Sequence, residues 1–281
     1  MTTWNSEDRA FLAEAVSFFE SDSFLKRLTE KMSQPADALM SALPEKLSHK
    51  IDIGSQVALR KALGMAIGTL SSGSGDGYGD NKKLKSSFLI HTALAGASGA
   101  VAGTFGLASL LWELPLSTGI ILRSIASIAS EWGEDLSDPE TIIECLTVFG
   151  LTPSGDKGDL GALHYYIERV ALGKSAQQAK IYMGQYGAKE ILRSLENGSS
   201  PALVNFLAAI ASRFKINASY KGLSKSVPIV GAVSGAGINV MFSKYYADAA
   251  NYHFGLRALG RLYGEESLRK AYEALAKGQA G

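Results

Sequence analysis

The sequence contains a single cysteine, Cys145, among its 281 residues. One thiol cannot form an internal disulfide, and it is too few for the thiolate ligands of a typical structural zinc site. The four histidines are scattered along the chain, and no two of them have the spacing of a metal-binding helix. We therefore expect no disulfide framework, no metal centre and no cofactor.

The chain also lacks an excess of charge of one sign. Its formal net charge is +1, and it has no run of basic residues that could gather a polyanion, so we expect no nucleic-acid partner. Glu7, Asp8 and Arg9 stand near the start, with no uninterrupted apolar stretch after them. This pattern does not resemble a secretory signal, and we expect a cytoplasmic protein.

Alternation of apolar and polar residues, the mark of a half-buried strand, is missing throughout. Apolar residues instead recur every three or four positions, so the predicted fold class is all-α, a single compact helical domain. We expect the N-terminal amphipathic helices of residues 1–46 to pack on a main helical domain of residues 47–281. The predicted helices cover residues 11–28, 47–70, 116–132, 137–149, 160–172, 175–195, 201–215, 246–260 and 265–276.

Two of these helices have clear starting signals. Ser137-Asp-Pro-Glu140 combines a capping side chain, an early proline and an acid at the positive end of the helix dipole. Ser175 and Gln178 have the spacing of a capping box. We therefore predict that one helix ends before Gly173 and that another begins at Ser175.

The segment from Phe88 to Trp112 carries no formal charge, and we expect Glu113 and Pro115 to end it. It is long enough to span a bilayer, for which roughly 20 apolar residues suffice. Much of it is Gly, Ala, Ser and Thr, so its hydropathy is weak. This composition favours a buried core helix over a peripheral or partly inserted membrane element, and over a true membrane span, although all three stay open.

Glycines recur within this segment at steps of three and four residues, and a second apolar stretch, residues 227–242, has a matching four-residue step. Such spacing places the glycines on one helical face, where another backbone can approach closely. We predict that the two glycine-rich apolar helices pack against each other at the centre of the domain. The helix-packing residues are Gly96, Gly99, Gly103, Gly106, Gly231 and Gly235.

A small set of polar residues stands in apolar surroundings. Glu113 and Arg123 would be costly to bury alone and are natural partners, as a structural ion pair or, less often, around a catalytic carboxylate. Asn239, His253 and Arg257 fall in the C-terminal apolar region, and the last two are four residues apart, on one helical face. For His253, a role as a hydrogen-bonded interior histidine is more common than a role as a metal ligand. No recognisable catalytic motif is present, so the sequence leans against an enzyme.

Several short blocks occur together in a fairly specific combination. They are Glu113-Leu-Pro115, Ser117, Thr118, Arg123-Ser-Ile125, Gly133-Glu-Asp135, Asp138-Pro-Glu140, Val227-Pro-Ile-Val-Gly231, Ile238-Asn-Val-Met-Phe242 and His253. With these blocks the chain resembles the EcsC family, and the likeness runs from about Leu47 to about Arg261. The resemblance implies a bacterial protein of poorly defined biochemistry. The namesake of the family is encoded beside the two components of an ATP-binding-cassette exporter that is linked to secretion and protein processing.

Three functions remain open on the sequence alone. The first is a non-enzymatic accessory or adaptor protein at or near the cytoplasmic face of the plasma membrane, with a lipid or membrane-protein partner and a possible link to transport or secretion. The second is an enzyme or an apolar-ligand or lipid-binding protein with its pocket between the glycine-rich helices, where Glu113, Arg123 and His253 would converge. The third is a module that binds a helix of another protein. The sequence does not give the oligomeric state.

Overall fold

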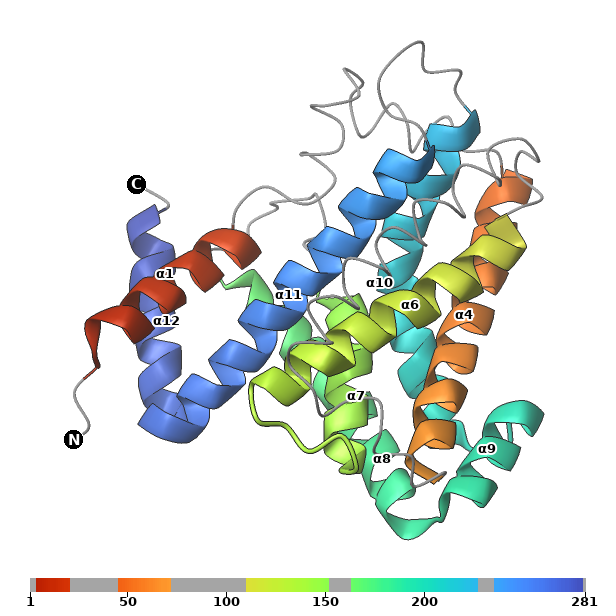
Figure 1. Ribbon diagram of the computed structural model, residues 1–281, viewed down its shortest axis with the longest axis horizontal. Helices are drawn as coiled ribbons and strands as arrows, with labels where there is room; N and C mark the ends of the chain where they lie inside the picture. The colour runs from red at the N-terminus through yellow and green to blue at the C-terminus, as the bar shows by residue number, and fades with distance from the viewer. Residues whose placement is uncertain (1–3, 21–44, 72–109, 152–162, 227–234, 280–281) are drawn as a thin grey trace.

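The computed structural model describes residues 4–20, 45–71, 110–151, 163–226 and 235–279 (Figure 1). Helices account for nearly all of these residues and none of them forms a strand, which confirms the all-α prediction. The helices are α1 (Ser6–Glu20), α4 (Glu45–Ser71), α6 (Leu110–Glu131), α7 (Pro139–Thr147), the short 3-10 turn η3 (Val148–Gly150), α8 (His164–Gln185), α9 (Ala188–Asn197), α10 (Pro201–Ser226), α11 (Gly235–Tyr263) and α12 (Glu265–Gln279).

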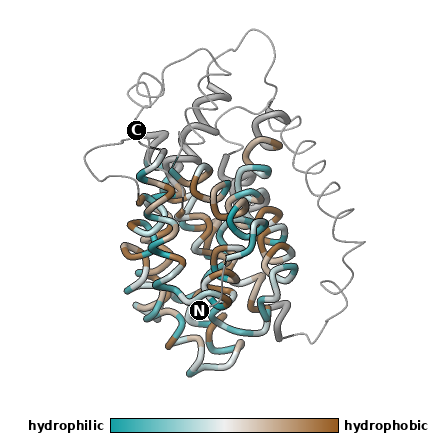
Figure 2. The backbone as a smooth tube through the Cα atoms, turned by 90° about the vertical axis from the view of Figure 1, so that its left-hand side faces the viewer, coloured by the Kyte–Doolittle hydropathy of each residue, from teal (hydrophilic) through white to brown (hydrophobic). Residues whose placement is uncertain are grey.

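Helix α11 connects two groups of helices. It packs against α6 along one side and against α12 and α1 on the other, while α4, α6, α8, α9 and α10 form the larger group (Figure 1). Within that group α4 contacts α6, α9 and α10, and α8 contacts α7 and α10. Hydrophobic and hydrophilic residues alternate along the helices in Figure 2, as expected where each helix has one buried side.

Aromatic side chains fill much of the core, and α1 supplies part of them. Phe19 is fully buried with its ring centroid 4.6 Å from that of Tyr165 on α8. Phe18 lies 5.5 Å from Tyr245 and 5.1 Å from Tyr252, both on α11. Each such side chain contributes about 1.5–3 kcal/mol on burial. Helix α1 is therefore part of the core. The predicted domain boundary near residue 46 stays a prediction, because residues 21–44 lie outside the described part.

The last residue of α1 fixes the start of α8. The Glu20 carboxylate accepts hydrogen bonds from the backbone N–H groups of His164 at 2.8 Å and Tyr165 at 3.2 Å. The Tyr272 hydroxyl of α12 donates to the same carboxylate at 2.7 Å. The first N–H groups of a helix have no partner within it, and a negative charge there complements the helix dipole. Glu20 thus joins α1, α8 and α12.

The predicted break between Gly173 and Ser175 is wrong. Helix α8 runs through both residues, and the Ser175 hydroxyl donates to the Leu172 carbonyl instead of capping a new helix. A glycine inside a helix costs only about 1 kcal/mol, which the packing of α8 against α10 and α7 offsets. The chain breaks at Gly187, whose extended backbone precedes α9.

The expected helix end at Pro115 is also wrong, since α6 begins at Leu110 and continues through this proline to Glu131. A proline this close to the start of a helix removes one intrahelical hydrogen bond without ending the helix. The predicted start of α7 is confirmed. Asp138 is the N-cap and its carboxylate accepts from the Glu140 N–H at 2.8 Å, with Pro139 as the first helical residue.

The predicted pair of glycine-rich helices falls mostly outside the described residues. Gly235 is the first residue of α11, and nothing is described of its packing. The central packing of the two apolar stretches therefore stays a prediction. Gly96, Gly99, Gly103, Gly106 and Gly231 lie outside the described residues. Among the helices that the structure describes, none combines the length and the hydropathy needed to cross a bilayer.

Candidate functional site

The strongest concentration of buried polar groups surrounds His253 on α11. Its side chain is fully buried, with Nε2 2.9 Å from the Glu144 carboxylate of α7 and Nδ1 3.1 Å from the Tyr165 hydroxyl of α8. Arg257, one turn further along α11, lies 3.1 Å from the same Glu144 carboxylate. His253 and Arg257, the two residues singled out in the sequence, therefore both contact the carboxylate of Glu144.

The surrounding charges form one connected group, which we call the Glu144 network. Arg257 also pairs with Glu134 at 3.0 Å and with Glu140 at 3.3 Å, and Arg169 lies 3.7 Å from Glu144. The network consists of Glu134 after α6, Glu140 and Glu144 on α7, Tyr165, Arg169 and Lys180 on α8, and His253, Arg257 and Arg261 on α11. It ties together the turn after α6 and three helices.

Opposing effects set the protonation of the central pair. Burial raises the pKa of Glu144, but the hydrogen bond from His253 and the charges of Arg169 and Arg257 outweigh it and lower that pKa to about 2. Burial lowers the pKa of His253 below its ordinary value, against the hydrogen bond and charge of Glu144. His253 is therefore neutral and Glu144 is ionised.

This protonation state fixes the direction of each hydrogen bond. A carboxylate can only accept, so His253 Nε2 carries the proton and donates to Glu144. Nδ1 then accepts from the Tyr165 hydroxyl, whose oxygen accepts from Arg169 at 3.4 Å. The four side chains form one continuous chain of hydrogen bonds from guanidinium to carboxylate.

The same residue types perform acid–base chemistry in many enzymes, but here the histidine is enclosed by the protein. His253 has no exposed surface, and both of its ring nitrogens have protein partners. Cys145 is fully buried, and burial raises the pKa of its thiol, which keeps it protonated and unreactive. No three His, Cys, Asp or Glu side chains in the described ranges are arranged to hold a metal ion. The network is organised to hold helices together.

The other predicted polar residues do not join the network through any described contact. Arg123 is exposed on α6, so its charge is not buried in the apolar core. It faces away from the buried side of α6, where Ile121 and Ile125 pack into the core. The side chains of Glu113 and Asn239 lie outside the described part, and the pairing of Glu113 with Arg123 stays a prediction.

Sequence reasoning missed the acidic half of the network. Glu140 and Glu144 are four residues apart on α7, so they share one face of that helix. Two acids on one side of a short, otherwise largely buried helix are a signal for cationic partners. The identity of those partners is set by the packing of α7 on α8 and the approach of α11, which the sequence does not show.

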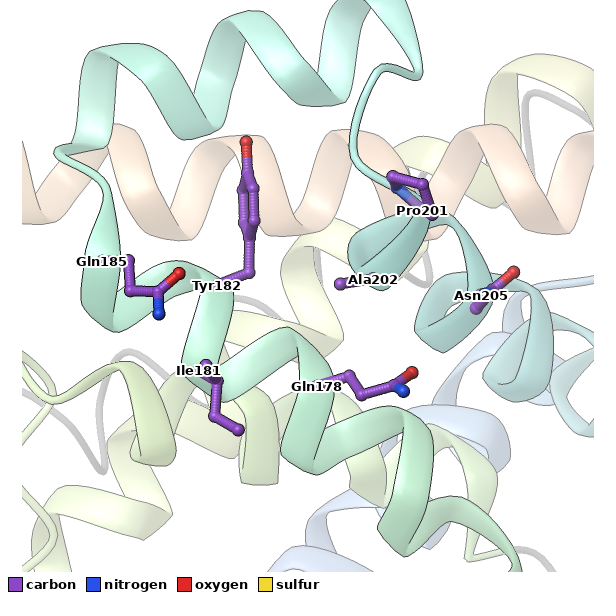
Figure 3. Close-up of a pocket in the computed structure, with 7 residues that line it drawn as sticks. All are labelled: Gln178, Ile181, Tyr182, Gln185, Pro201, Ala202 and Asn205. Carbon is purple, nitrogen blue, oxygen red and sulfur yellow. The ribbon is translucent and has the colours of Figure 1, made fainter.

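A separate pocket of about 420 Å³ opens between α8 and the start of α10 (Figure 3). The residues that line it are Gln178, Ile181, Tyr182, Gln185, Pro201, Ala202 and Asn205. None of them is charged, and the Tyr182 hydroxyl is hydrogen-bonded to Ser194 at 2.7 Å. The pocket shares no residue with the Glu144 network and contains neither an acid nor a base for catalysis.

The blocks noted in the sequence and every member of the Glu144 network except Arg261 fall within one family match. The model of the EcsC protein family matches residues 80–259. The chain belongs to the EcsC family. The EcsC match includes α6, α7, α8, α9, α10 and most of α11, and leaves out α1, α4 and α12. Neither the curated proteins nor the solved structures contain a match to the chain.

The buried histidine makes the stability of this EcsC-family protein depend on pH. The pKa of His253 is lowered in the folded state, so below about pH 6.5 the unfolded chain binds a proton that the folded protein does not. We expect the melting temperature to fall as the pH decreases from 7 to 5. Glu144, whose pKa is lowered to about 2, adds a second loss of stability as the pH falls from about 4.5 towards 2.

Thermal melts in a series of buffers test this expectation. In His253→Gln the fall between pH 7 and pH 5 should be smaller than in the wild type. The matched control is His49→Gln on the exposed side of α4, which should keep the wild-type slope. A wild-type slope in His253→Gln would contradict the assignment of a neutral buried histidine.

Proposed function

We propose that this EcsC-family chain is a non-enzymatic accessory or adaptor protein that works at the cytoplasmic face of the plasma membrane, in connection with transport or secretion. The observation that carries the proposal is the closed Glu144 network. Its histidine and the carboxylates and arginines around it are engaged with one another, and His253 is sealed from solvent. Such an arrangement supports a rigid scaffold better than a reaction centre.

The placement of the helices supports a membrane contact at one end of the protein. Helices α6 and α11 lie side by side and begin at the same end of the bundle (Figure 1). The charge-free stretch from Phe88 runs into the start of α6, and the second glycine-rich stretch runs into α11. Both apolar stretches therefore join the described helices at one end. Peripheral membrane proteins bind lipid through apolar area that is concentrated in this way.

The alternative of an enzyme or an apolar-ligand carrier receives less support. It requires Glu113, Arg123 and His253 to converge on an open cavity, but His253 is enclosed and Arg123 is exposed on α6. The pocket of Figure 3 lies between α8 and α10, and polar amide side chains make up much of its lining. Neither observation favours this alternative.

Flotation with phospholipid vesicles tests the proposal. The full-length chain is mixed with vesicles of phosphatidylcholine and phosphatidylglycerol and centrifuged through a density gradient, and membranes of the expressing cells are fractionated in parallel. We expect the protein to rise with the vesicles and to be recovered in part with the membranes. Protein that stays at the bottom of the gradient and wholly in the soluble fraction would refute a membrane role.

A further inference from the structure

Helix α4 carries apolar and basic side chains together on its outer side. Three of its apolar residues are unusually exposed, with 46% of the surface of Ile53, 39% of Val57 and 42% of Met65 accessible. Exposed polar and basic residues lie between them. We call this face the α4 stripe, and its exposed members are His49, Ile53, Gln56, Val57, Arg60, Lys61 and Met65.

The stripe is distinct from the side of α4 that holds the fold together. Ala58, Leu59, Ala62 and Leu63 are completely buried, where α4 packs on α6, α9 and α10. Figure 1 shows α4 at the outer edge of the larger group of helices. Ile53 and Val57 lie on the exposed side of α4, away from these buried residues, and Met65 borders the contact with α6, since its side chain lies against Gly119.

The charges of the stripe are unbalanced. Arg60 and Lys61 form no ion pair among the described residues, whereas Arg257 in the Glu144 network contacts three carboxylates. No member of the stripe is acidic, and Asp52 on the same helix is half-buried. The exposed face of α4 is therefore apolar and positively charged at once.

We propose that the α4 stripe is a second surface, in addition to the apolar end, by which the protein docks on an anionic phospholipid membrane. The inference rests on the proposed membrane function. It adds which face of the protein binds the membrane and which charge the lipid carries. Helices that lie in a membrane interface combine buried apolar side chains with cations that meet anionic headgroups. Each Lys or Arg near such a surface strengthens binding by about fivefold at physiological salt. Charge complementarity thus favours acidic lipid over a neutral bilayer.

The first experiment removes the two cations. Partitioning of the full-length protein is measured with vesicles of phosphatidylcholine alone and with vesicles that also contain phosphatidylglycerol. We expect tighter binding to the acidic vesicles, and we expect Arg60→Ala with Lys61→Ala to weaken it by about 20-fold or more. The matched control is Lys189→Ala with Arg193→Ala, which removes two exposed cations from α9 and should change binding less than about twofold.

The second experiment removes the apolar part of the stripe. Ile53→Ser with Val57→Ser should weaken binding to acidic vesicles and leave the melting temperature close to that of the control Val170→Ser, a residue of α8 that is 78% exposed. A melting temperature well below that of the control would mean that the stripe is covered inside the fold and would overturn the proposal. The proposal would also be overturned if the wild type formed dimers and these substitutions dissociated them, because a second copy would then cover the stripe.

The outcomes separate this inference from the proposed function. If the wild type binds acidic vesicles and the α4 variants bind equally well, the membrane function stands and the α4 stripe is the wrong face. Equal binding of the wild type to neutral and acidic vesicles would also overturn the charge-based docking. If the wild type binds no vesicles at all, both proposals fail.

Discussion

Replacing Glu144 with glutamine is expected to lower the free energy of unfolding by about 3–5 kcal/mol. The carboxylate lies 2.9 Å from His253 and 3.1 Å from Arg257, and it faces Arg169 at 3.7 Å. A glutamine of the same shape carries no charge, so Arg169 loses the carboxylate that it faces and Arg257 keeps only Glu134 and Glu140, in a partly buried site. Removing one member of a buried ion pair costs more than the pair contributes, because the remaining charge stays buried.

Urea unfolding followed by circular dichroism measures this change. The control is Glu131→Gln at the exposed end of α6, which makes the same substitution on the surface and should alter stability by less than about 0.5 kcal/mol. A loss of similar size in both variants would show that Glu144 is not the centre of the network.

Replacing Gly255 with alanine is expected to cost about 1–3 kcal/mol. Gly255 is buried in α11, and a methyl group there would collide with the ring of Phe11 from α1 and come within 3.0 Å of Trp132. The Phe11 ring is confined, since its centroid lies 5.1 Å from that of Trp132 and 5.6 Å from that of Tyr252. The added methyl group therefore pushes α1 away from α11.

The control uses a glycine in open space. Gly173 lies inside α8 with no atom within 4 Å of an added methyl group, so Gly173→Ala should stabilise the protein by up to about 1 kcal/mol. A shorter side chain at residue 11 should relieve the collision, and Gly255→Ala should cost little in a Phe11→Ala background. Additive effects of these two changes would contradict the contact between α1 and α11.

Local signals in the sequence predict much of the fold. The start of α7 depends on Asp138, Pro139 and Glu140, which are neighbours in the chain, and the structure confirms it. The continuous α8 could not be predicted in the same way. Gly173 and Ser175 locally favour a break, and the packing of α8 on α7 and α10, which overrides that preference, is set by residues distant in sequence.

The candidate site, too, is only partly predictable from local patterns in the sequence. The four-residue step between His253 and Arg257 places both on one face of α11, and this is visible in the sequence. Glu144 is 109 residues from His253, and no local pattern connects them. Arg123 illustrates the opposite error, because an apolar neighbourhood in sequence suggests burial although the residue lies on the exposed side of α6.

The joining of α1 to α11 and α12 has a consequence for how the protein is made. A ribosome synthesises α1 first and its partners last, at about 5–20 residues per second. Phe19 can meet Tyr165 once α8 is made, but the partners of Phe18, Tyr245 and Tyr252, are synthesised only near the end of translation. We therefore expect the aromatic side of α1 to stay incompletely covered during synthesis, and the completion of α11 to be the step that ends its exposure.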